Sequence, residues 1–318
     1  MTSAAGGGIA PTLGAAELVA AVPGLEAVAR IEARSPLRLG SSSLTLEHIA
    51  GVAEEIRAGF DAGFDGAVVI QGTDTIEETA FILDLLVRDE RPVVVVGAMR
   101  GPQQPGADGP ANLLAAATVA ASEAARGLGT LVVLNDEIHA ARFVRKAHTA
   151  LTSAFVSDSA GPLGMVAEGR ARLLARVTPA PLPAALAART EHEAGNLPPV
   201  ALLKIAMGDD GRLIEAIPGL GYAGLVIEGA GAGHVPGAVA EIVGAVAARI
   251  PVVLASRTLA GPVFEKTYGY PGSEIDLIGR GLMPAGLLTG VKARILLAFA
   301  LRAGWDRAAI RAGLQAYG

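Results

Sequence analysis

Three short apolar runs constrain the fold of this 318-residue chain most strongly. They are "GAVVIQG" (66–72), "RPVVVVGAM" (91–99) and "GTLVVLNDEI" (129–138). Valine-rich runs of this length are typical of strands that are buried on both faces of a parallel sheet. The segments between them, 75–89 and 109–127, carry apolar residues at three- and four-residue spacing, which predicts crossover helices. The alternation therefore predicts an α/β fold with a doubly wound parallel sheet.

A proline-rich segment, "TPAPLPAALAARTEHEAGNLPP" (178–199), interrupts this alternation. The chain is also longer than a single hydrophobic core usually allows. We therefore predict an N-terminal α/β domain over 1–180, a linker over 181–198 and a smaller C-terminal α/β domain over 199–318. Strands in "VALLKIAMG", "AGLVIEGAGAGH" and "IPVVLASR", followed by a helix in "VKARILLAFALRAGW", are expected in the second domain.

Composition narrows the classes of function. The chain is 51% hydrophobic and 18% charged, which is typical of a globular protein. Its net charge of -5 and scattered basic residues do not favour nucleic acid as a partner. It has no membrane-length apolar run and no leader pattern, so we expect a cytoplasmic protein without membrane contact. With no cysteine and no metal-binding spacing among its five histidines, we predict no metal and no cofactor.

The sharpest local signal is "VVIQGTDTIEETAFILDLL" (68–86). Thr73 and Asp74 follow a predicted strand and precede a predicted helix, where α/β sheets place their ligands. Thr75 and Glu78 match the S/T-x-x-E capping box that opens a helix. On spacing alone, ordinary turn and cap residues explain the same pattern, and this alternative stays open.

The segment "QGTDTIEETAFILDLL" resembles the signature of bacterial-type L-asparaginases, HGTDTxEETAxxLDL, with Gln71 in place of the usual histidine. The resemblance continues in family order through "RPVVVVGAMRGPQQPGADGPANLLAA", "LVVLNDEIHAARFVRK", "AGPLG" and "GLMPAGLLTGVKARILLAFAL". It covers nearly the whole chain. It implies hydrolysis of L-asparagine to L-aspartate and ammonia through a threonine acyl-enzyme, with glutamine as a poorer substrate.

The resemblance also implies three catalytic residues. Thr73 matches the second active-site threonine, and Asp74 matches the carboxylate that pairs with it and binds the α-amino group of the substrate. Lys146 matches the lysine that activates this threonine. Such a lysine can accept the hydroxyl proton when burial disfavours its ammonium form. Without the resemblance, Lys146 is interpreted as a surface lysine.

Three further residues are implied to bind substrate. The turn at Gly40 matches a G-S-x-D loop whose serine contacts the substrate carboxylate, which makes Ser41 a candidate with Ser42 beside it. Ser43 stands where the family has aspartate. Glu274, in "YGYPGSEIDL", matches a glutamate that reaches a neighbouring subunit's site, which implies a homo-oligomer, either a dimer or a tetramer. Without the resemblance, the serines form a capping turn and Glu274 is an exposed loop carboxylate.

The family's first motif is a strand that ends in G-G-T-I-A and supplies the other active-site threonine, generally taken as the nucleophile. "GGGIA" (6–10) imitates it, but "MTSAA" before it has no apolar run that could form a central strand. We therefore expect no strand before Gly6 and interpret 6–10 as the end of a glycine-rich flap. On this interpretation Met1 lies just after the true motif, and the printed chain has little or no turnover. The family's flap tyrosine is also missing, since no tyrosine precedes Tyr222.

Two other classes of function stay open. One is a non-catalytic amino-acid-binding homologue. The other is a nucleotide-dependent enzyme that uses the glycines of "LVIEGAGAGHVPGAVAEIV" (225–243), although these do not complete G-x-G-x-x-G. The resemblance instead makes this turn structural, with His234 as a residue that lines the substrate entrance.

Overall fold

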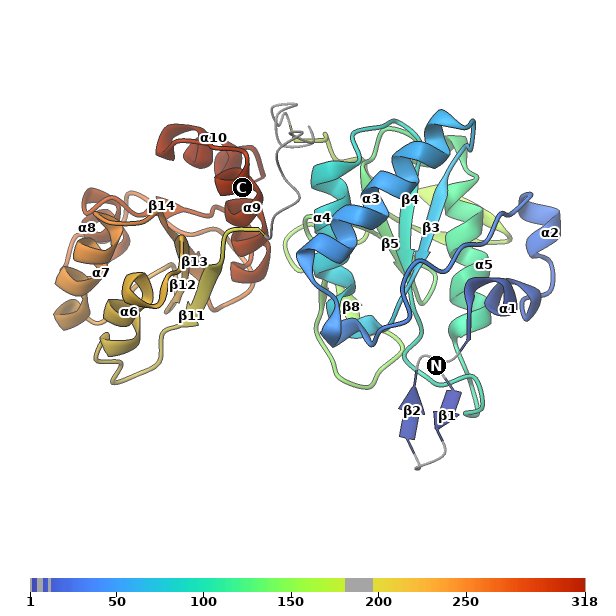
Figure 1. The fold of residues 1–318 in the computed structure, drawn as a ribbon, viewed down its shortest axis with the longest axis horizontal. Coiled ribbons are helices and arrows are strands. Elements are labelled where there is room, and N and C mark those ends of the chain that lie inside the picture. Colours follow the sequence, from blue (N-terminus) through green and yellow to red (C-terminus); the bar gives the residue numbers. More distant parts are fainter. Residues whose placement is uncertain (1, 5–7, 11–12, 181–196, 318) are drawn as a thin grey trace. The chain divides into compact units, whose positions relative to one another are not determined.

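The computed structural model describes residues 2–4, 8–10, 13–180 and 197–317, which form two compact units, Met1–Pro179 and Ala180–Gly318 (Figure 1). The two units are described separately below. The linker expected at 181–198 lies outside the described residues, apart from Leu197 and Pro198.

The first unit is built on a six-stranded sheet with the order β10-β9-β6-β5-β4-β3. Its strands are β3 (Ala67–Ile70), β4 (Val93–Val96), β5 (Thr130–Leu134), β6 (Glu137–Ala140), β9 (Gly164–Ala167) and β10 (Arg170–Leu173). Strands β3, β4 and β5 are parallel, as predicted, and the remaining pairs are antiparallel. The α/β class is therefore confirmed, and the sheet as a whole is mixed.

The segment 129–138 is not one continuous strand, and the prediction there is wrong. The chain reverses at Asn135 and Asp136, whose φ angles are 53° and 61°, and β5 and β6 pair as an antiparallel hairpin. Two successive left-handed residues are typical of a type I′ hairpin turn. Asparagine and aspartate tolerate this conformation better than other non-glycine residues. The "ND" dipeptide was thus the sequence signal for the turn.

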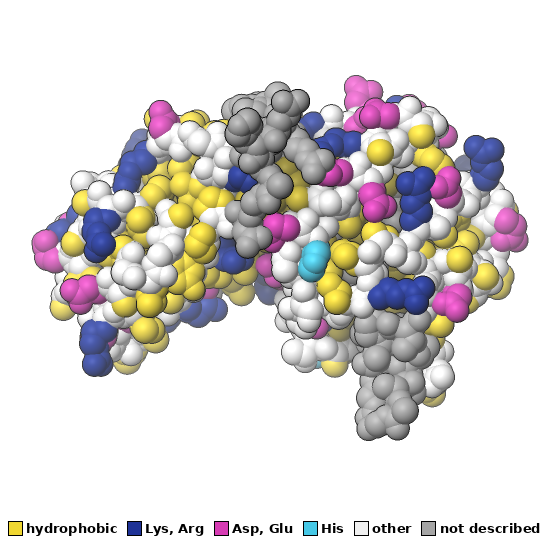
Figure 2. Space-filling view, viewed as in Figure 1, with side chains coloured by type: hydrophobic (Ala, Val, Ile, Leu, Met, Phe, Trp, Pro, Cys, Tyr) yellow, Lys and Arg dark blue, Asp and Glu magenta, His cyan; other side chains and the backbone are white. Residues whose placement is uncertain are grey.

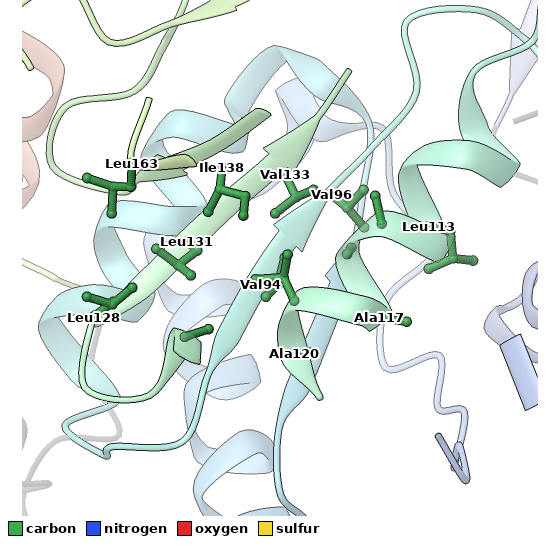
Figure 3. Packing of buried hydrophobic residues seen from close by; sticks show 14 of the residues in the cluster. Val94, Val96, Leu113, Ala117, Ala120, Leu128, Leu131, Val133, Ile138 and Leu163 are labelled. Atoms are coloured by element: carbon green, nitrogen blue, oxygen red, sulfur yellow. The ribbon is translucent and has the colours of Figure 1, made fainter. Parts of the chain in front are cut away.

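Helices cover both faces of the parallel strands. Helix α5 (Gly109–Ala120) packs on the face that carries Val94 and Val96, and Figure 3 shows Leu113, Ala117 and Ala120 on this side. Helix α4 (Ile76–Leu86) packs on the other face, with α3 (Leu46–Asp61) outside it (Figure 1). Both crossovers step in the same direction along the sheet, yet their helices lie on opposite faces. One of the two crossovers therefore has a left-handed sense, against the usual rule.

The N-terminal residues form a separate hairpin, in which β1 (Thr2–Ala4) pairs antiparallel with β2 (Gly8–Ala10). The expectation that no strand precedes Gly6 is therefore wrong, although β1 has only three residues and does not join the six-stranded sheet. Residues 5–7 of the expected flap lie outside the described residues. Short helices α1 (Ala15–Ala20) and α2 (Leu25–Val28) follow the hairpin.

The second unit has a fully parallel four-stranded sheet with the order β11-β12-β13-β14. These strands are Val200–Lys204, Gly224–Gly229, Val252–Ser256 and Met283–Pro284. Its helices are α6 (Arg212–Ala216), α7 (Ala240–Ala247), α8 (Glu274–Gly279), α9 (Gly290–Arg302) and α10 (Arg307–Tyr317). The second α/β sheet and the long helix predicted after it are confirmed.

The surface mixes both signs of charge. On the face seen in Figure 2, basic and acidic side chains are interspersed among apolar ones and form no continuous basic track over the described residues. Within the described ranges, every helix is too short or too polar to cross a membrane.

Candidate active site

The turn that follows β3 carries the first two predicted catalytic residues. Gly72 continues the extended backbone, and a short 3₁₀ turn, η2 (Thr73–Thr75), leads directly into α4. Thr73 is buried with 8% of its surface exposed, whereas the side chain of Asp74 is 64% exposed. The turn therefore presents a sheltered hydroxyl beside a carboxylate that faces solvent.

The side chain of Lys146 contacts this turn, although Lys146 lies 73 residues after Thr73 in the sequence. It lies on β7 (Arg145–Lys146), which pairs with β8 (Phe155–Val156) so that Lys146 is opposite the buried Phe155. Its Nζ donates to Thr73 Oγ1 at 2.9 Å and to Asp74 Oδ1 at 2.7 Å. Only 16% of the lysine side chain is exposed, so its interpretation as a surface lysine is wrong.

This geometry can move a proton. An amine accepts a proton only in its neutral form, and the neutral Lys146 would lie within hydrogen-bond reach of the Thr73 hydroxyl. The Asp74 carboxylate then stabilises the ammonium that forms, because Asp74 Oδ1 lies 2.7 Å from Lys146 Nζ. A hydroxyl, a base and a group that orients the base are the three parts of an activated nucleophile.

The predicted substrate-binding turn lies against η2. Ser41 begins a 3₁₀ turn, η1 (Ser41–Ser43), and is 5% exposed. A Cβ atom on Gly72 would come within 2.8 Å of Ser41 Oγ, so this close approach requires glycine at 72. Ser42 lies on the same turn and is exposed. The structure thus brings Ser41 next to the Thr73 turn and leaves Ser42 facing solvent.

The serines do not cap the helix that follows, so that alternative interpretation is wrong. The N-cap of α3 is Thr45, whose Oγ1 accepts from the His48 N–H at 3.2 Å. His48 Nδ1 in turn accepts from the Thr45 N–H at 3.1 Å. The serine turn is therefore free for another role.

The predicted capping box of α4 is also wrong. Thr75 occupies the N-cap position, but its side chain makes no capping hydrogen bond. Its hydroxyl instead donates to the carbonyl oxygen of Ser41 at 3.0 Å and accepts from Gln71 Nε2 at 3.2 Å. The S/T-x-x-E spacing predicts a hydrogen bond within the first turn of α4. In the folded chain the Thr75 hydroxyl instead binds the carbonyl oxygen of Ser41.

Sequence reasoning missed two residues that shape the site. Gly97 follows β4, and a Cβ atom there would lie 2.7 Å from the carbonyl oxygen of Gln71 and 3.0 Å from Thr73 Cγ2. Asn112, which is 3% exposed, donates to the carbonyl oxygen of Gly97 and accepts from the N–H of Asn135, each at 3.0 Å. It therefore ties together the carboxyl ends of β4 and β5. A polar residue on the buried face of a predicted helix was the available signal.

Glu274 lies in the second unit, as the first residue of α8, and is 0% exposed. Its interpretation as an exposed loop carboxylate is therefore wrong. Its Oε1 accepts from the N–H groups of Thr267 at 2.8 Å and Tyr268 at 2.6 Å, and its Oε2 accepts from His234 Nε2 at 3.0 Å. Burial by itself would raise the pKa of Glu274, but these hydrogen bonds outweigh it and the pKa is lowered.

The imidazole of His234 is held from both sides. Its Nε2–H donates to the Glu274 carboxylate, and its Nδ1 lies 2.9 Å from the hydroxyl oxygen of Tyr270. The rings of Tyr268 and Tyr270 stand edge-on to it at centroid distances of 5.1 and 5.6 Å. His234 is therefore a fully partnered side chain.

The glycine-rich loop after β12 closes on itself. The N–H of Ala230 donates to the carbonyl oxygen of His234, and the reverse bond also forms, both at 2.8 Å. Helix α7 begins only at Ala240. A dinucleotide site needs a glycine turn that opens directly into a helix, so the loop lacks the frame of that motif. In the part of the chain that the structure describes, acidic and histidine side chains form no cluster of three that could hold a metal ion.

Comparison with known proteins gives one consistent family. Residues 1–178 match the model of the asparaginase N-terminal domain, and residues 199–314 match that of the glutaminase/asparaginase C-terminal domain. An L-asparaginase of Bacillus licheniformis is 36% identical over 86% of this chain and 82% of its own. A probable periplasmic L-asparaginase of Haemophilus influenzae is 33% identical over 89% and 79% of the two chains. The crystal structure of a probable cytoplasmic L-asparaginase from Campylobacter jejuni superposes with a TM-score of 0.84 at 32% identity, covering 94% of this chain and 92% of that one.

Proposed function

This chain belongs to the asparaginase family, and on that premise we propose that it hydrolyses the side-chain amide of L-asparagine to L-aspartate and ammonia. The observation that carries the proposal is the pairing of Lys146 with Thr73 and Asp74. The three residues match the family's catalytic positions, and their side chains meet although Lys146 is remote in sequence.

The proposed chemistry uses a threonine hydroxyl to attack the amide carbon, and in the family the first active-site threonine is generally taken as this nucleophile. Thr73 is the second threonine: the neutral amine of Lys146 takes its proton, Thr73 in turn takes the proton of the attacking hydroxyl, and the ammonium that forms on Lys146 returns a proton to the departing ammonia. The covalent ester is then cleaved by water, which releases aspartate. Asp74 binds the α-amino group of the substrate, and Ser41 and Ser42 bind its α-carboxylate.

The test replaces the Thr73 hydroxyl by a methyl group. In the full-length protein, Thr73→Val should lower the kcat for ammonia release by about 100-fold or more, with an unchanged melting temperature. Acid quenching during turnover, followed by peptide mapping, identifies the acylated threonine. Turnover by Thr73→Val at the rate of the parent would refute the proposed role of Thr73.

The alternative is a non-catalytic amino-acid-binding homologue. It predicts calorimetric binding of L-asparagine or L-aspartate without any ammonia release.

The proposed assembly is a homo-oligomer. Its support is the match of the Glu274 segment to one that reaches a neighbouring subunit's site in the family, although the Glu274 side chain itself is 0% exposed in the protomer. Light scattering after gel filtration should give a dimer or tetramer, and a fully active monomer would contradict this assembly.

The proposed compartment is the cytoplasm, the location given for the Campylobacter jejuni relative. The Haemophilus influenzae relative is named as periplasmic, so the family occupies more than one compartment. Fractionation of the native cells measures the location directly.

A further inference from the structure

The hydroxyl of Thr75 joins two turns that the sequence keeps 34 residues apart. It donates to the carbonyl oxygen of Ser41 at 3.0 Å and accepts from Gln71 Nε2 at 3.2 Å. The same Gln71 amide group donates to the carbonyl oxygen of Gly72 at 3.2 Å. We call this chain of hydrogen bonds, from Gln71 through Thr75 to Ser41, the relay.

The relay exists at the expense of local helix stability. A threonine at an N-cap normally accepts from the backbone N–H of the second or third helical residue, and Thr75 gives up this bond at the start of α4. Gln71 carries a second cost, because its Oε1 is buried without a hydrogen-bond partner among the described residues. The side chains of Thr75 and Gln71 are thus placed by tertiary contacts and not by the hydrogen bonds of the helix start. Buried groups left unsatisfied in this way call for an explanation beyond stability.

The relay fixes the Ser41 turn over the Thr73 turn. Ser41 itself approaches so closely that its Oγ would be 2.8 Å from a Cβ at position 72, so the two turns touch through the relay and through the backbone of Gly72. We propose that Thr75 is the positioning residue of the substrate-carboxylate turn, and that Gln71 orients Thr75 by donating to it. This inference rests on the proposed function, in which Ser41 binds substrate and Thr73 carries the chemistry.

A positioning role predicts an effect on substrate binding rather than on the chemical step. Thr75→Val keeps the shape of the side chain and removes the hydroxyl, so the Ser41 carbonyl loses its donor. We expect the KM for L-asparagine to rise about 3- to 10-fold, the range that one hydrogen bond supplies, with kcat within about 2-fold of the parent. Thr75→Ser keeps the hydroxyl and should restore the parent KM.

Variants at position 71 test whether Gln71 acts through its hydrogen bond to Thr75. Gln71→Leu removes both donors and should raise KM to a similar extent as Thr75→Val. The two changes act through the same bonds, so the double variant should show the KM of either single variant and not their product. The neutral ring of Gln71→His carries a single N–H and can replace only one of the two hydrogen bonds that the Gln71 amide donates, so its KM should lie between those of the parent and Gln71→Leu.

Steady-state kinetics in the full-length protein, with melting temperatures for every variant, decide the result. The inference is overturned if Thr75→Val and Thr75→Ser have the same KM, or if Thr75→Val lowers the melting temperature and kcat with KM unchanged. The parallel variant Thr73→Val separates this outcome from a failure of the proposed function. If Thr73→Val retains full turnover, the site assignment itself is refuted. If Thr73→Val is inactive while Thr75→Val binds substrate normally, only the relay is refuted.

Discussion

Two loops of this protein follow a parallel strand and contain glycine, one after β3 and one after β12. In the first, the side chains of Thr73 and Thr75 are bound by residues 73 and 34 positions away. In the second, the backbone closes on itself between Ala230 and His234. Both loops occupy the end of the sheet where ligands usually bind. The position alone does not make a site, because the loop must also hold polar side chains that its own backbone does not use.

The largest expected effect comes from removing the base of the first loop. Lys146→Met keeps the length of the side chain and removes the amine, so the Thr73 hydroxyl loses its proton acceptor. We expect kcat to fall about 100- to 10,000-fold. The matched control is Lys204→Met, which removes a lysine paired with Glu228 on β12. Equal loss of ammonia release in both variants would remove the functional difference between the loops.

A smaller effect is expected at Asp74. Asp74→Asn removes the negative charge that is proposed to bind the substrate's amino group and weakens the pair with Lys146. Hydrogen bonds to charged groups are worth about 1.5–3 kcal/mol, so KM should rise about 10- to 100-fold. Asp210→Asn is the control in the second unit, where the carboxylate pairs with Arg212 at the surface. A KM unchanged by Asp74→Asn would contradict the amine-binding role.

The next prediction concerns stability in the second unit. Glu274→Gln should lower the free energy of unfolding at neutral pH by about 1–3 kcal/mol, since the charged acceptor of three hydrogen bonds is lost. The pKa of this carboxyl is lowered from 4.5, so its contribution is present above pH 4.5 and is lost as the pH falls through the folded-state pKa. Fluorescence of Trp305, the single tryptophan, reports unfolding of this unit.

Glu241, an exposed carboxylate that pairs with Arg280, is the control for that measurement. Its side chain is 83% exposed, and Glu241→Gln should leave the unfolding transition unchanged. A difference between parent and Glu274→Gln that stays constant down to pH 2 would contradict the assigned role of the charge.

The smallest expected effect separates the two units by their response to acid. His139 of β6 is 1% exposed, and its Nδ1 lies 3.0 Å from Ser157 Oγ. Burial lowers the pKa of His139 from 6.5, so the unfolded chain binds a proton before the folded one. Its stabilising effect is therefore complete above pH 6.5 and falls by up to about 1.4 kcal/mol per pH unit below it, until the folded-state pKa is reached.

Hydrogen exchange of peptides from β6 and β8 measures this effect in the first unit. The parent should lose protection between pH 6.5 and 5.5, and His139→Gln should flatten this dependence. Peptides around Glu274 should keep their protection over the same range, because that carboxyl titrates only below 4.5. An equal loss of protection in the peptides of β6 and in those around Glu274 would contradict the expected difference between the two units.

Much of the fold was accessible from sequence because its strands are short apolar runs between helical patterns. The parallel strands β3, β4, β11, β12 and β13 were all predicted on this basis. The antiparallel half of the first sheet was not, since β9 has only four residues, "GMVA", and β10 alternates between exposed and half-buried positions and carries two arginines. The turn at Asn135 and Asp136 was missed because neither glycine nor proline separates "TLVVL" before it from "EIHA" after it.

The candidate site divides in the same way. The turn of Thr73 and Asp74 was located because a strand, a turn and a helix lie next to one another in the sequence, and the family resemblance implied the roles of the two residues. Thr75 was assigned to a cap and Glu274 to an exposed loop, because local spacing says nothing about a carbonyl oxygen 34 residues away or about the burial of a loop. Asn112 was overlooked because two of its hydrogen bonds, with Gly97 and Asn135, join strand ends that only the folded sheet brings together.

The sequence by itself determined the alternation of strands and helices, the two-sheet architecture and the turn that carries Thr73, since each depends on residues within a few positions of one another. Tertiary structure alone decided that Lys146 meets Thr73, that the Thr75 hydroxyl binds the Ser41 carbonyl and that Glu274 is buried against His234. These contacts depend on the pairing of β7 with β8, on the packing of η1 against η2 and on the loop around α8. Pairing and packing join residues that are distant in the chain, so local sequence pattern does not encode them.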